Sequence, residues 1–207
     1  MSVSEDRTVQ PATAAPTTGI ADPAPLGLAA FAATTFLLSA ANAGWMTKAT
    51  GDAWLGYAFA YGGFAQLLAG MWEFRNRNVF GATAFSTYGG FWIGLGLWAL
   101  LVAPKAASPA AANHDIAWIL LTFAIINTYL LILSTQVTMA VFLVFLTLEV
   151  TEIILFIGLF GGSTGTVKFG GYVGLVTALV AFYTSAAGVS NGLAGKVRFP
   201  VGRPLLS

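Results

Sequence analysis

Long apolar runs alternate with short polar breaks along almost the whole chain. Asp22-Pro23-Ala24-Pro25 comes before the first run and has the pattern of a helix start, with a capping side chain followed by prolines where backbone N–H groups lack partners anyway. The run then reaches Met46 without a charge, about 20 residues or roughly 30 Å of helix, which matches a bilayer core. Five further runs lie at about residues 53–74, 82–103, 117–133, 137–160 and 170–193. The pattern therefore predicts six transmembrane helices.

The fourth and fifth runs must be separated within a stretch that carries no charge. The 33 residues between Asp115 and Glu149 would rise about 50 Å as one helix, which exceeds any bilayer. Ser134-Thr135-Gln136 is the predicted break, because three polar residues follow one another there. Residues 105–115 and the glycine-rich residues 161–165 are predicted to be loops.

Composition places most of the chain in lipid. The sequence is 57% hydrophobic and only 8% charged, whereas an ordinary soluble domain carries about 25% charged residues. We therefore predict an all-α, polytopic membrane protein with six transmembrane helices in residues 22–195. Residues 1–21 are rich in Ala, Thr and Pro and are predicted to be a disordered tail, and residues 196–207 are predicted to be a C-terminal tail.

Several functional classes are excluded by what the sequence lacks. A net charge of +1 gives no basic face for nucleic acid, and the absence of cysteine removes thiolate metal sites. The single histidine, His114, is interpreted as a solvated loop residue, because one imidazole cannot build a metal or two-histidine haem site. No P-loop, zinc signature or nucleophile elbow occurs. We therefore expect no cofactor, no metal and no enzymatic activity, and infer transport.

The distribution of Lys and Arg predicts how the chain is oriented. The N-terminus, the second and fourth connections and the C-terminus share one side of the membrane and hold six basic residues, and the other side holds three. The six are Arg7, Arg75, Arg77, Lys196, Arg198 and Arg203, and the three are Lys48, Lys105 and Lys168. Because cytoplasmic loops are enriched in basic residues, both termini are predicted to be cytoplasmic, in a plasma (cell inner) membrane protein.

Two carboxyl groups fall inside the fifth span. Glu149 lies near mid-depth, and the spacing of three residues places Glu149 and Glu152 on one helix face. A charge at that depth costs on the order of 3 kcal/mol or more, and no Lys or Arg lies within any span to neutralise it. The two groups are therefore proton-site candidates. The alternative is a hydrogen-bonded pair at a subunit contact or central axis.

Other polar residues lie in the first two spans. Glu73 is four residues before Arg77, and the sequence predicts an interfacial ion pair of Glu73 with Arg75 or Arg77. Thr34, Thr35, Ser39 and Asn42 lie partly at helical spacing in the first span and could line a path. Hydroxyl groups in membrane helices also commonly bond their own helix carbonyls, so a structural role stays open for each threonine.

Several motifs in the first three spans resemble those of one family. Residues 22–28 are similar to the Asn-Pro-Ala-Pro-Leu-Gly-Leu signature of the acetate uptake transporter (AceTr) family, the YaaH-type acetate and succinate permeases and their fungal relatives. Tyr61-Gly62-Gly63, Ala65-Gln66, Ala69-Gly70 and Glu73 resemble its second span, and Asn78, Phe80-Gly81, Thr83-Ala84-Phe85 and Tyr88-Gly89 its third. Glu149 and Glu152 are not part of the pattern.

The resemblance implies a six-helix protomer in a homohexamer, with a path for acetate and related small monocarboxylates in each protomer and coupling to protons. By matching position it implies a hydrophobic constriction at Phe31, Tyr88 and Leu148. A polar lining is implied for Thr34, Thr35, Asn42, Gln66 and Thr87. The expected partners are thus a small carboxylate, protons, membrane lipid and further copies of the chain, without nucleic acid.

Two alternatives stay open at the level of sequence. One is a passive channel for a carboxylate or for ammonia. The other is a membrane sensor or assembly protein that has the fold without transport. Proton-coupled uptake of acetate, with succinate among the related substrates, is the leading hypothesis.

Overall fold

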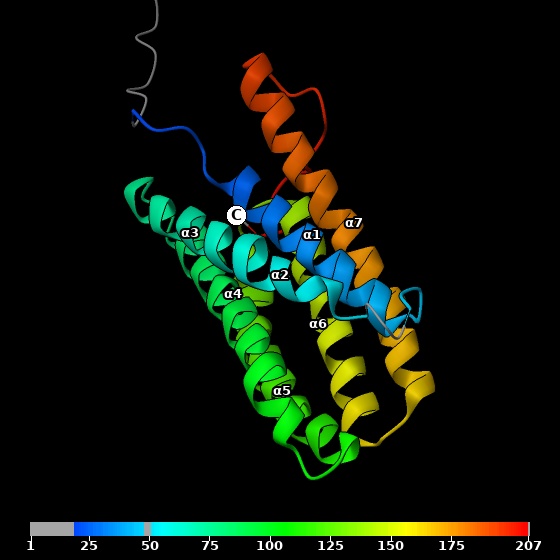
Figure 1. Ribbon diagram of the computed structural model, residues 1–207. Coiled ribbons are helices and arrows are strands. Elements are labelled where there is room, and N and C mark those ends of the chain that lie inside the picture. The colour runs from blue at the N-terminus through cyan, green and yellow to red at the C-terminus, as the bar shows by residue number, and fades with distance from the viewer. Residues whose placement is uncertain (1–18, 48–50, 207) are drawn as a thin grey trace, which may run out of the picture.

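A computed structural model describes residues 19–47 and 51–206, and every regular element among them is a helix (Figure 1). The predicted disordered tail lies mostly in residues 1–18, outside the described residues. The elements are α1 (Ala24–Asn42), η1 (Gly51–Ala53), α2 (Trp54–Phe59), η2 (Ala60–Ala65), α3 (Gln66–Arg75), α4 (Val79–Leu97), η3 (Trp98–Val102), η4 (Ala103–Lys105), α5 (Pro109–Ser134), α6 (Met139–Phe160) and α7 (Thr164–Ala194).

These elements form the six predicted membrane-crossing rods. Five helices among the described residues are long and apolar enough to cross a membrane: α1, α4 with its short extension, α5, α6 and α7. The remaining rod runs through α2, η2 and α3, where a π-helical turn at Ala60–Ala65 joins two shorter α-helices. The prediction of an all-α membrane protein with six transmembrane helices is confirmed.

The break in the long uncharged stretch also lies where it was predicted. Helix α5 ends at Ser134 and α6 begins at Met139. The Thr138 side chain accepts a hydrogen bond from the N–H of Val141 at 3.3 Å, which caps the new helix. The break therefore has a local cause in the sequence.

Two predicted loops are shorter than the sequence suggested. The Ser108 hydroxyl accepts from the N–H of Ala111 at 3.1 Å, so α5 begins at Pro109, and His114 lies on this helix rather than in a loop. The ring of His114 packs against Phe160, with ring centroids 4.8 Å apart. Likewise, Ser163 caps α7, so this helix begins at Thr164 instead of near residue 170. In both places the helix begins at a serine N-cap, several residues before the apolar run begins.

The rods pack as two groups that meet across the middle of the molecule. Helix α1 lies along α7, α7 along α6 and α6 along α5, while α3 lies along α4 (Figure 1). Close approach depends on small residues. A side chain at Gly171 would overlap the backbone at the end of α1, and the hydroxyl of Ser185 on α7 donates to the carbonyl of Pro25 at 2.6 Å.

The segment after α7 folds back onto the connection between α5 and α6. The N–H of Ala140 donates to the carbonyl of Val201 at 2.9 Å, and the N–H of Leu205 donates to the carbonyl of Thr135 at 2.8 Å. The side chain of Asn191 bonds the backbone of Arg198 and Phe199. The predicted C-terminal tail is therefore held against one end of the bundle over the residues that the structure describes.

Neighbouring glycines on α4 provide a matched test of this packing. Replacing Gly89 by alanine is expected to lower the free energy of unfolding by about 1–3 kcal/mol, because the new methyl group would press on the backbone of Leu67 in α3. Replacing Gly90 by alanine adds the same group where nothing lies within 4 Å, and should not destabilise the protein. Thermal unfolding of both variants in detergent measures the difference. Equal losses in the two variants would contradict this account of the α3–α4 contact.

Candidate functional site

Three buried side chains from three helices meet near the centre of the molecule. Phe31 on α1 and Tyr88 on α4 make an edge-to-face contact, with ring centroids 5.8 Å apart and planes at 74°. Leu148 on α6 lines the same two cavities as these rings. This set of Phe31, Tyr88 and Leu148 is the predicted constriction.

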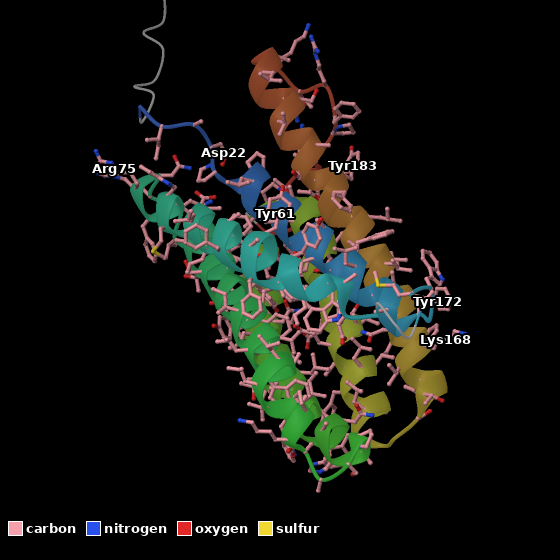
Figure 2. The ribbon with its side chains drawn as sticks, viewed as in Figure 1. Asp22, Tyr61, Arg75, Lys168, Tyr172 and Tyr183 are labelled. Atoms are coloured by element: carbon pink, nitrogen blue, oxygen red, sulfur yellow. The ribbon has the colours of Figure 1, made fainter. Side chains whose placement is uncertain are left out.

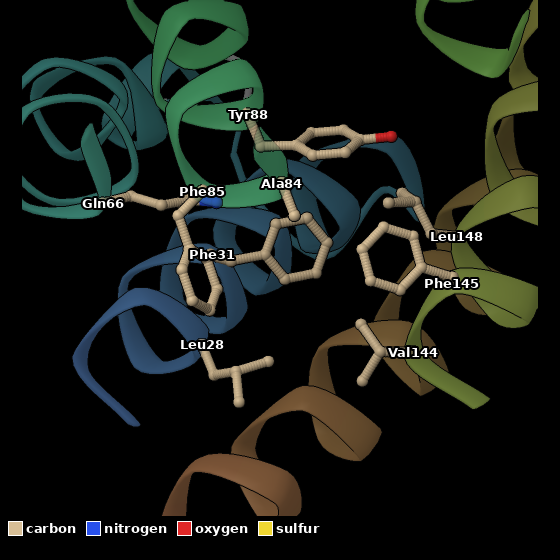
Figure 3. Close-up of a pocket in the computed structure, with 9 residues that line it drawn as sticks. All are labelled: Leu28, Phe31, Gln66, Ala84, Phe85, Tyr88, Val144, Phe145 and Leu148. Carbon is tan, nitrogen blue, oxygen red and sulfur yellow. The ribbon is translucent and has the colours of Figure 1, made fainter. Parts of the chain in front are cut away.

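One cavity of about 30 Å³ lies against the constriction and also touches Gln66; we call it the Gln66 chamber. Figure 3 shows the Phe31 ring near the middle of this pocket, with Tyr88 and Leu148 to one side and Leu28 and Val144 to the other. Gln66 is the one amide in its lining, and its Oε1 is buried without a hydrogen-bond partner among the described residues. This chamber is otherwise apolar or aromatic.

A second cavity of about 40 Å³ shares Phe31, Tyr88 and Leu148 with the first; we call it the Glu152 chamber. Its polar lining is Thr35, Ser39, Asn42, Trp92, Thr151 and Glu152. Because the two chambers have only the constriction residues in common, those three side chains separate them.

The Glu152 chamber continues into wider space at one end of the bundle. A cavity of about 310 Å³ shares Leu38, Asn42, Leu120 and Leu155 with it and adds Asp52 and Asn113. A further cavity of about 350 Å³ shares Asn42 and Asn113 and reaches Ser163. We call these two cavities the vestibule. Among the residues that the structure describes, no lysine or arginine lines either chamber or the vestibule.

A buried hydrogen-bond network holds the hydroxyl group of Tyr88, one of the three constriction residues. The Tyr88 hydroxyl lies 3.0 Å from Asn127 Oδ1 and 3.3 Å from Glu152 Oε1, and it has one proton for these two acceptors. The Asn127 amide donates to the carbonyl of Phe145 at 3.0 Å and to Glu149 Oε2 at 2.7 Å. Both predicted carboxyl groups therefore belong to one network, joined through Asn127 and Tyr88.

The two carboxyl groups nevertheless have different surroundings. Glu152 is only 3% exposed, and it lines the Glu152 chamber. Glu149 is half-buried, and its Oε1 accepts from the hydroxyl of Thr128 at 2.8 Å on the outward side of α5. Of the two, Glu152 lines a cavity between the helices.

Comparison with known proteins identifies the family of this chain. The model of the GPR1/FUN34/yaaH family matches residues 6–202. The chain belongs to that family. Acetate permease A of Emericella nidulans is 38% identical over 83% of this chain and 62% of its own length. The succinate-acetate/proton symporter SatP of Escherichia coli is 36% identical over 89% of this chain and 97% of its own length.

A solved structure extends the match to the fold. The structure of the bacterial acetate channel SatP superposes with a TM-score of 0.81 at 31% identity, over 88% of this chain and 99% of that one. The chain spans less than two thirds of the length of the first curated relatives that it matches, which are fungal. The named relatives are transport proteins, which points away from an enzyme.

Three of the five residues of the expected polar lining lie at one or the other of the two chambers. Thr35 and Asn42 line the Glu152 chamber, and Gln66 lines the Gln66 chamber. Thr34 does not line either one, because its hydroxyl bonds the carbonyls of Ala30 and Tyr57 where α1 meets the second rod. Thr87 is half-buried and likewise lines neither chamber.

The expected ion pair of Glu73 with Arg77 does not form. Glu73 is fully buried, and its Oε2 accepts from the side-chain amide of Asn76 at 3.1 Å. Arg77 is exposed and has a left-handed φ of 60°, so it lies beyond the end of α3 at Arg75. Helical spacing therefore does not apply to this pair.

Three residues of the site were missed from the sequence, namely Trp92, Asn127 and Thr151. Trp92 lines the Glu152 chamber, and its Nε1 is buried without a partner among the described residues. A tryptophan well inside a span, away from the interfaces where this residue collects, was the available signal. Asn127 was recognisable as an amide within the long uncharged stretch. Among the described residues, no cluster of three potential metal ligands occurs.

Proposed function

We propose that the protein carries acetate and related small monocarboxylates across a membrane, through the vestibule, the Glu152 chamber, the constriction and the Gln66 chamber. One observation carries the proposal: two small cavities, whose described lining holds polar side chains but no lysine or arginine, meet at Phe31, Tyr88 and Leu148. The names of the relatives agree with this substrate class.

The chemistry of the path suits a small carboxylate. Hydroxyl, amide and indole groups donate hydrogen bonds to carboxylate oxygens, and without a fixed cation in the lining the anion is released readily. The rings of Phe31 and Tyr88 and the side chain of Leu148 form an apolar surface. This surface suits the methyl group of acetate and disfavours the passage of a hydrated ion. Chambers of about 30 and 40 Å³ match a molecule of few heavy atoms.

The proposed setting is the plasma membrane, with both termini in the cytoplasm. Six basic residues on the side of the termini against three on the other support this orientation. Figure 2 shows Arg75 close to the start of α1 near Asp22, and Lys168 toward the opposite end of that helix. Assembly as a homohexamer, which the family resemblance implies, belongs to the same proposal.

Proton coupling is the second part of the proposal, with Glu149 and Glu152 as candidate proton sites. A carboxyl group in the membrane interior can take up and release a proton during a transport cycle. The name of the solved relative, an acetate channel, favours one competing reading, which is passive passage of the anion. The two mechanisms differ in what drives net movement.

Reconstitution of the purified 207-residue chain into lipid vesicles tests the proposed function. We expect radiolabelled acetate to enter faster than into protein-free vesicles, with competition by propionate and lactate and weaker competition by succinate. The measurement is made at alkaline pH, because acetic acid crosses lipid unaided whereas its anion does not. Rates equal to those of protein-free vesicles at every pH would refute the proposal.

Imposed gradients then distinguish coupling from passive passage. One-to-one movement of a proton with an anion carries no net charge, so a proton gradient should drive it and a potassium–valinomycin potential should not. An anion channel should respond to the potential in the opposite way. We expect uptake driven by the proton gradient. Uptake driven by the potential would support acetate transport but contradict proton coupling.

A further inference from the structure

Three side chains that line the Glu152 chamber carry one buried polar atom each, and these three atoms have no hydrogen-bond partner among the described residues. They are Oγ1 of Thr35, Nε1 of Trp92 and Oε2 of Glu152. Each side chain is at least nine-tenths buried. Buried polar groups are normally paired, because an unpaired one costs about 1–3 kcal/mol. Three such atoms around one cavity therefore indicate a place built for a polar ligand.

The three groups form a layer directly beside the constriction. Thr35, Trp92 and Glu152 each follow a constriction residue by four positions on the same helix. Those helices, α1, α4 and α6, are the first, third and fifth spans and so run in the same direction through the membrane. Residues four apart share a helix face, about one turn or 6 Å along the axis. A polar ring thus precedes the apolar ring for a molecule that arrives from the vestibule.

The donors in this ring match a carboxylate. The indole N–H of Trp92 can only donate, and the hydroxyl of Thr35 can donate or accept. Glu152 donates only when protonated. Its Oε1 faces the Tyr88 hydroxyl, which leaves Oε2 to line the chamber. A protonated Glu152 avoids an uncompensated charge in the membrane interior, since no lysine or arginine of the described residues lines the cavity.

On the basis of the proposed function, we propose that the Glu152 chamber binds a small carboxylate as an acid–anion pair. One oxygen of the anion accepts from Trp92 Nε1 and Thr35 Oγ1, and the other accepts from the protonated Oε2 of Glu152. The proton then moves from Glu152 to the anion, which yields the neutral acid and a Glu152 carboxylate. No bond to carbon changes in this step. The neutral acid passes the apolar constriction, and Glu152 regains a proton from water in the vestibule.

Two ionisable groups lie beside Glu152, and those of the other helices around it are exposed. Tyr88 of α4 bonds its Oε1, and Glu149 lies one turn earlier on α6. Helix α1 carries no ionisable side chain. The ionisable groups of the two helices packed on α6 are all exposed, namely His114, Asp115 and Tyr129 of α5 and Lys168, Tyr172 and Tyr183 of α7. The pH dependence of ligand binding should therefore report Glu152, with Glu149 as its neighbour.

Acetate binding to the detergent-solubilised full chain tests the site without transport. The affinity, measured by calorimetry or by acetate-dependent thermal stabilisation, should fall as pH rises because the site requires a proton on Glu152. Glu152→Gln keeps a donor but cannot lose a proton, so this variant should bind acetate with an affinity that no longer depends on pH. It should also lose at least about tenfold of the proton-driven uptake into vesicles. A pH slope unchanged in E152Q would overturn the proposal.

Variants of the other two hydrogen-bond donors test the proposed site independently of Glu152. Thr35→Val keeps the shape of the side chain and Trp92→Phe keeps an aromatic ring, while both remove the donor; each should weaken acetate binding about tenfold because a hydrogen bond to a charged group is lost. Trp118→Phe is the matched control, because Trp118 is half-exposed on α5 and lines neither chamber; its binding should be unchanged.

The two proposals fail separately. Wild-type affinity in both W92F and T35V would overturn the carboxylate subsite, even if the wild-type protein moves acetate. Vesicles with no uptake by the wild-type protein would refute the proposed function. The subsite would still be supported if acetate binding depends on pH in the wild-type protein and no longer depends on pH in E152Q.

Discussion

Replacing Phe31 by alanine is expected to raise the rate of succinate passage relative to acetate by about tenfold, which corresponds to about 1.4 kcal/mol in relative barrier height. Phe31 is one of three side chains that separate the two chambers, and its ring packs edge-on against Tyr88. Without this ring the chambers join, and a four-carbon acid meets less resistance than it does at the native gate. Initial uptake rates of labelled acetate and succinate into vesicles measure the ratio.

Phe36→Ala is the matched control for this result. Phe36 lies on the same helix, packs against Phe182 with ring centroids 6.4 Å apart, and lines neither chamber. It loses the same atoms, so the change in substrate ratio should be confined to the Phe31 variant. A ratio that moves equally in both variants, or in neither, would show that Phe31 does not form the gate.

Replacing Asn127 by leucine is expected to cause the largest loss of stability, about 2–4 kcal/mol. The substitution removes the bonds to Tyr88, Glu149 and the carbonyl of Phe145, and all three partners belong to one buried or half-buried network. Leucine occupies a similar volume, so the loss should reflect these polar partners rather than a cavity. Unfolding in mixed micelles measures the change.

Asn113→Leu is the corresponding control on the same helix. Asn113 is exposed at the vestibule end of α5, where replacing its amide by an apolar group should change stability by no more than about 0.5 kcal/mol. Similar losses in both variants would mean that the network around Asn127 contributes little beyond ordinary packing.

The membrane fold was predictable because lipid imposes a simple rule on sequence. Runs of about 20 apolar residues identified all six rods, and the length limit of a single span located the break after Ser134. Helix starts outside the apolar runs were harder to place. The first turns of α5 and α7 consist largely of small and polar residues and depend on the hydroxyls of Ser108 and Ser163.

The site was only partly predictable because rotation of a helix about its axis depends on its neighbours. Thr34 and Thr35 are adjacent in sequence, but one bonds backbone carbonyls beside the second rod and the other lines the Glu152 chamber. Glu73 illustrates a different limit of the prediction. Its expected partner Arg77 has a left-handed backbone conformation and is no longer part of the helix, so helical spacing does not bring the two side chains together. Trp92 escaped notice because hydropathy treats an indole as apolar and ignores its N–H.

The π-helical turn at Ala60–Ala65 accommodates one residue more per turn than an α-helix would. The α-helical segments before and after the turn are therefore rotated relative to each other about the rod axis. The carbonyl of Tyr57 faces Thr34 on α1, while Gln66 faces the Gln66 chamber. Deletion of one residue here would convert the π-helical turn into an α-helical one without displacing either end of the rod. Single-residue deletions among membrane transporters of this architecture should therefore be tolerated within this turn far better than in the uninterrupted rods.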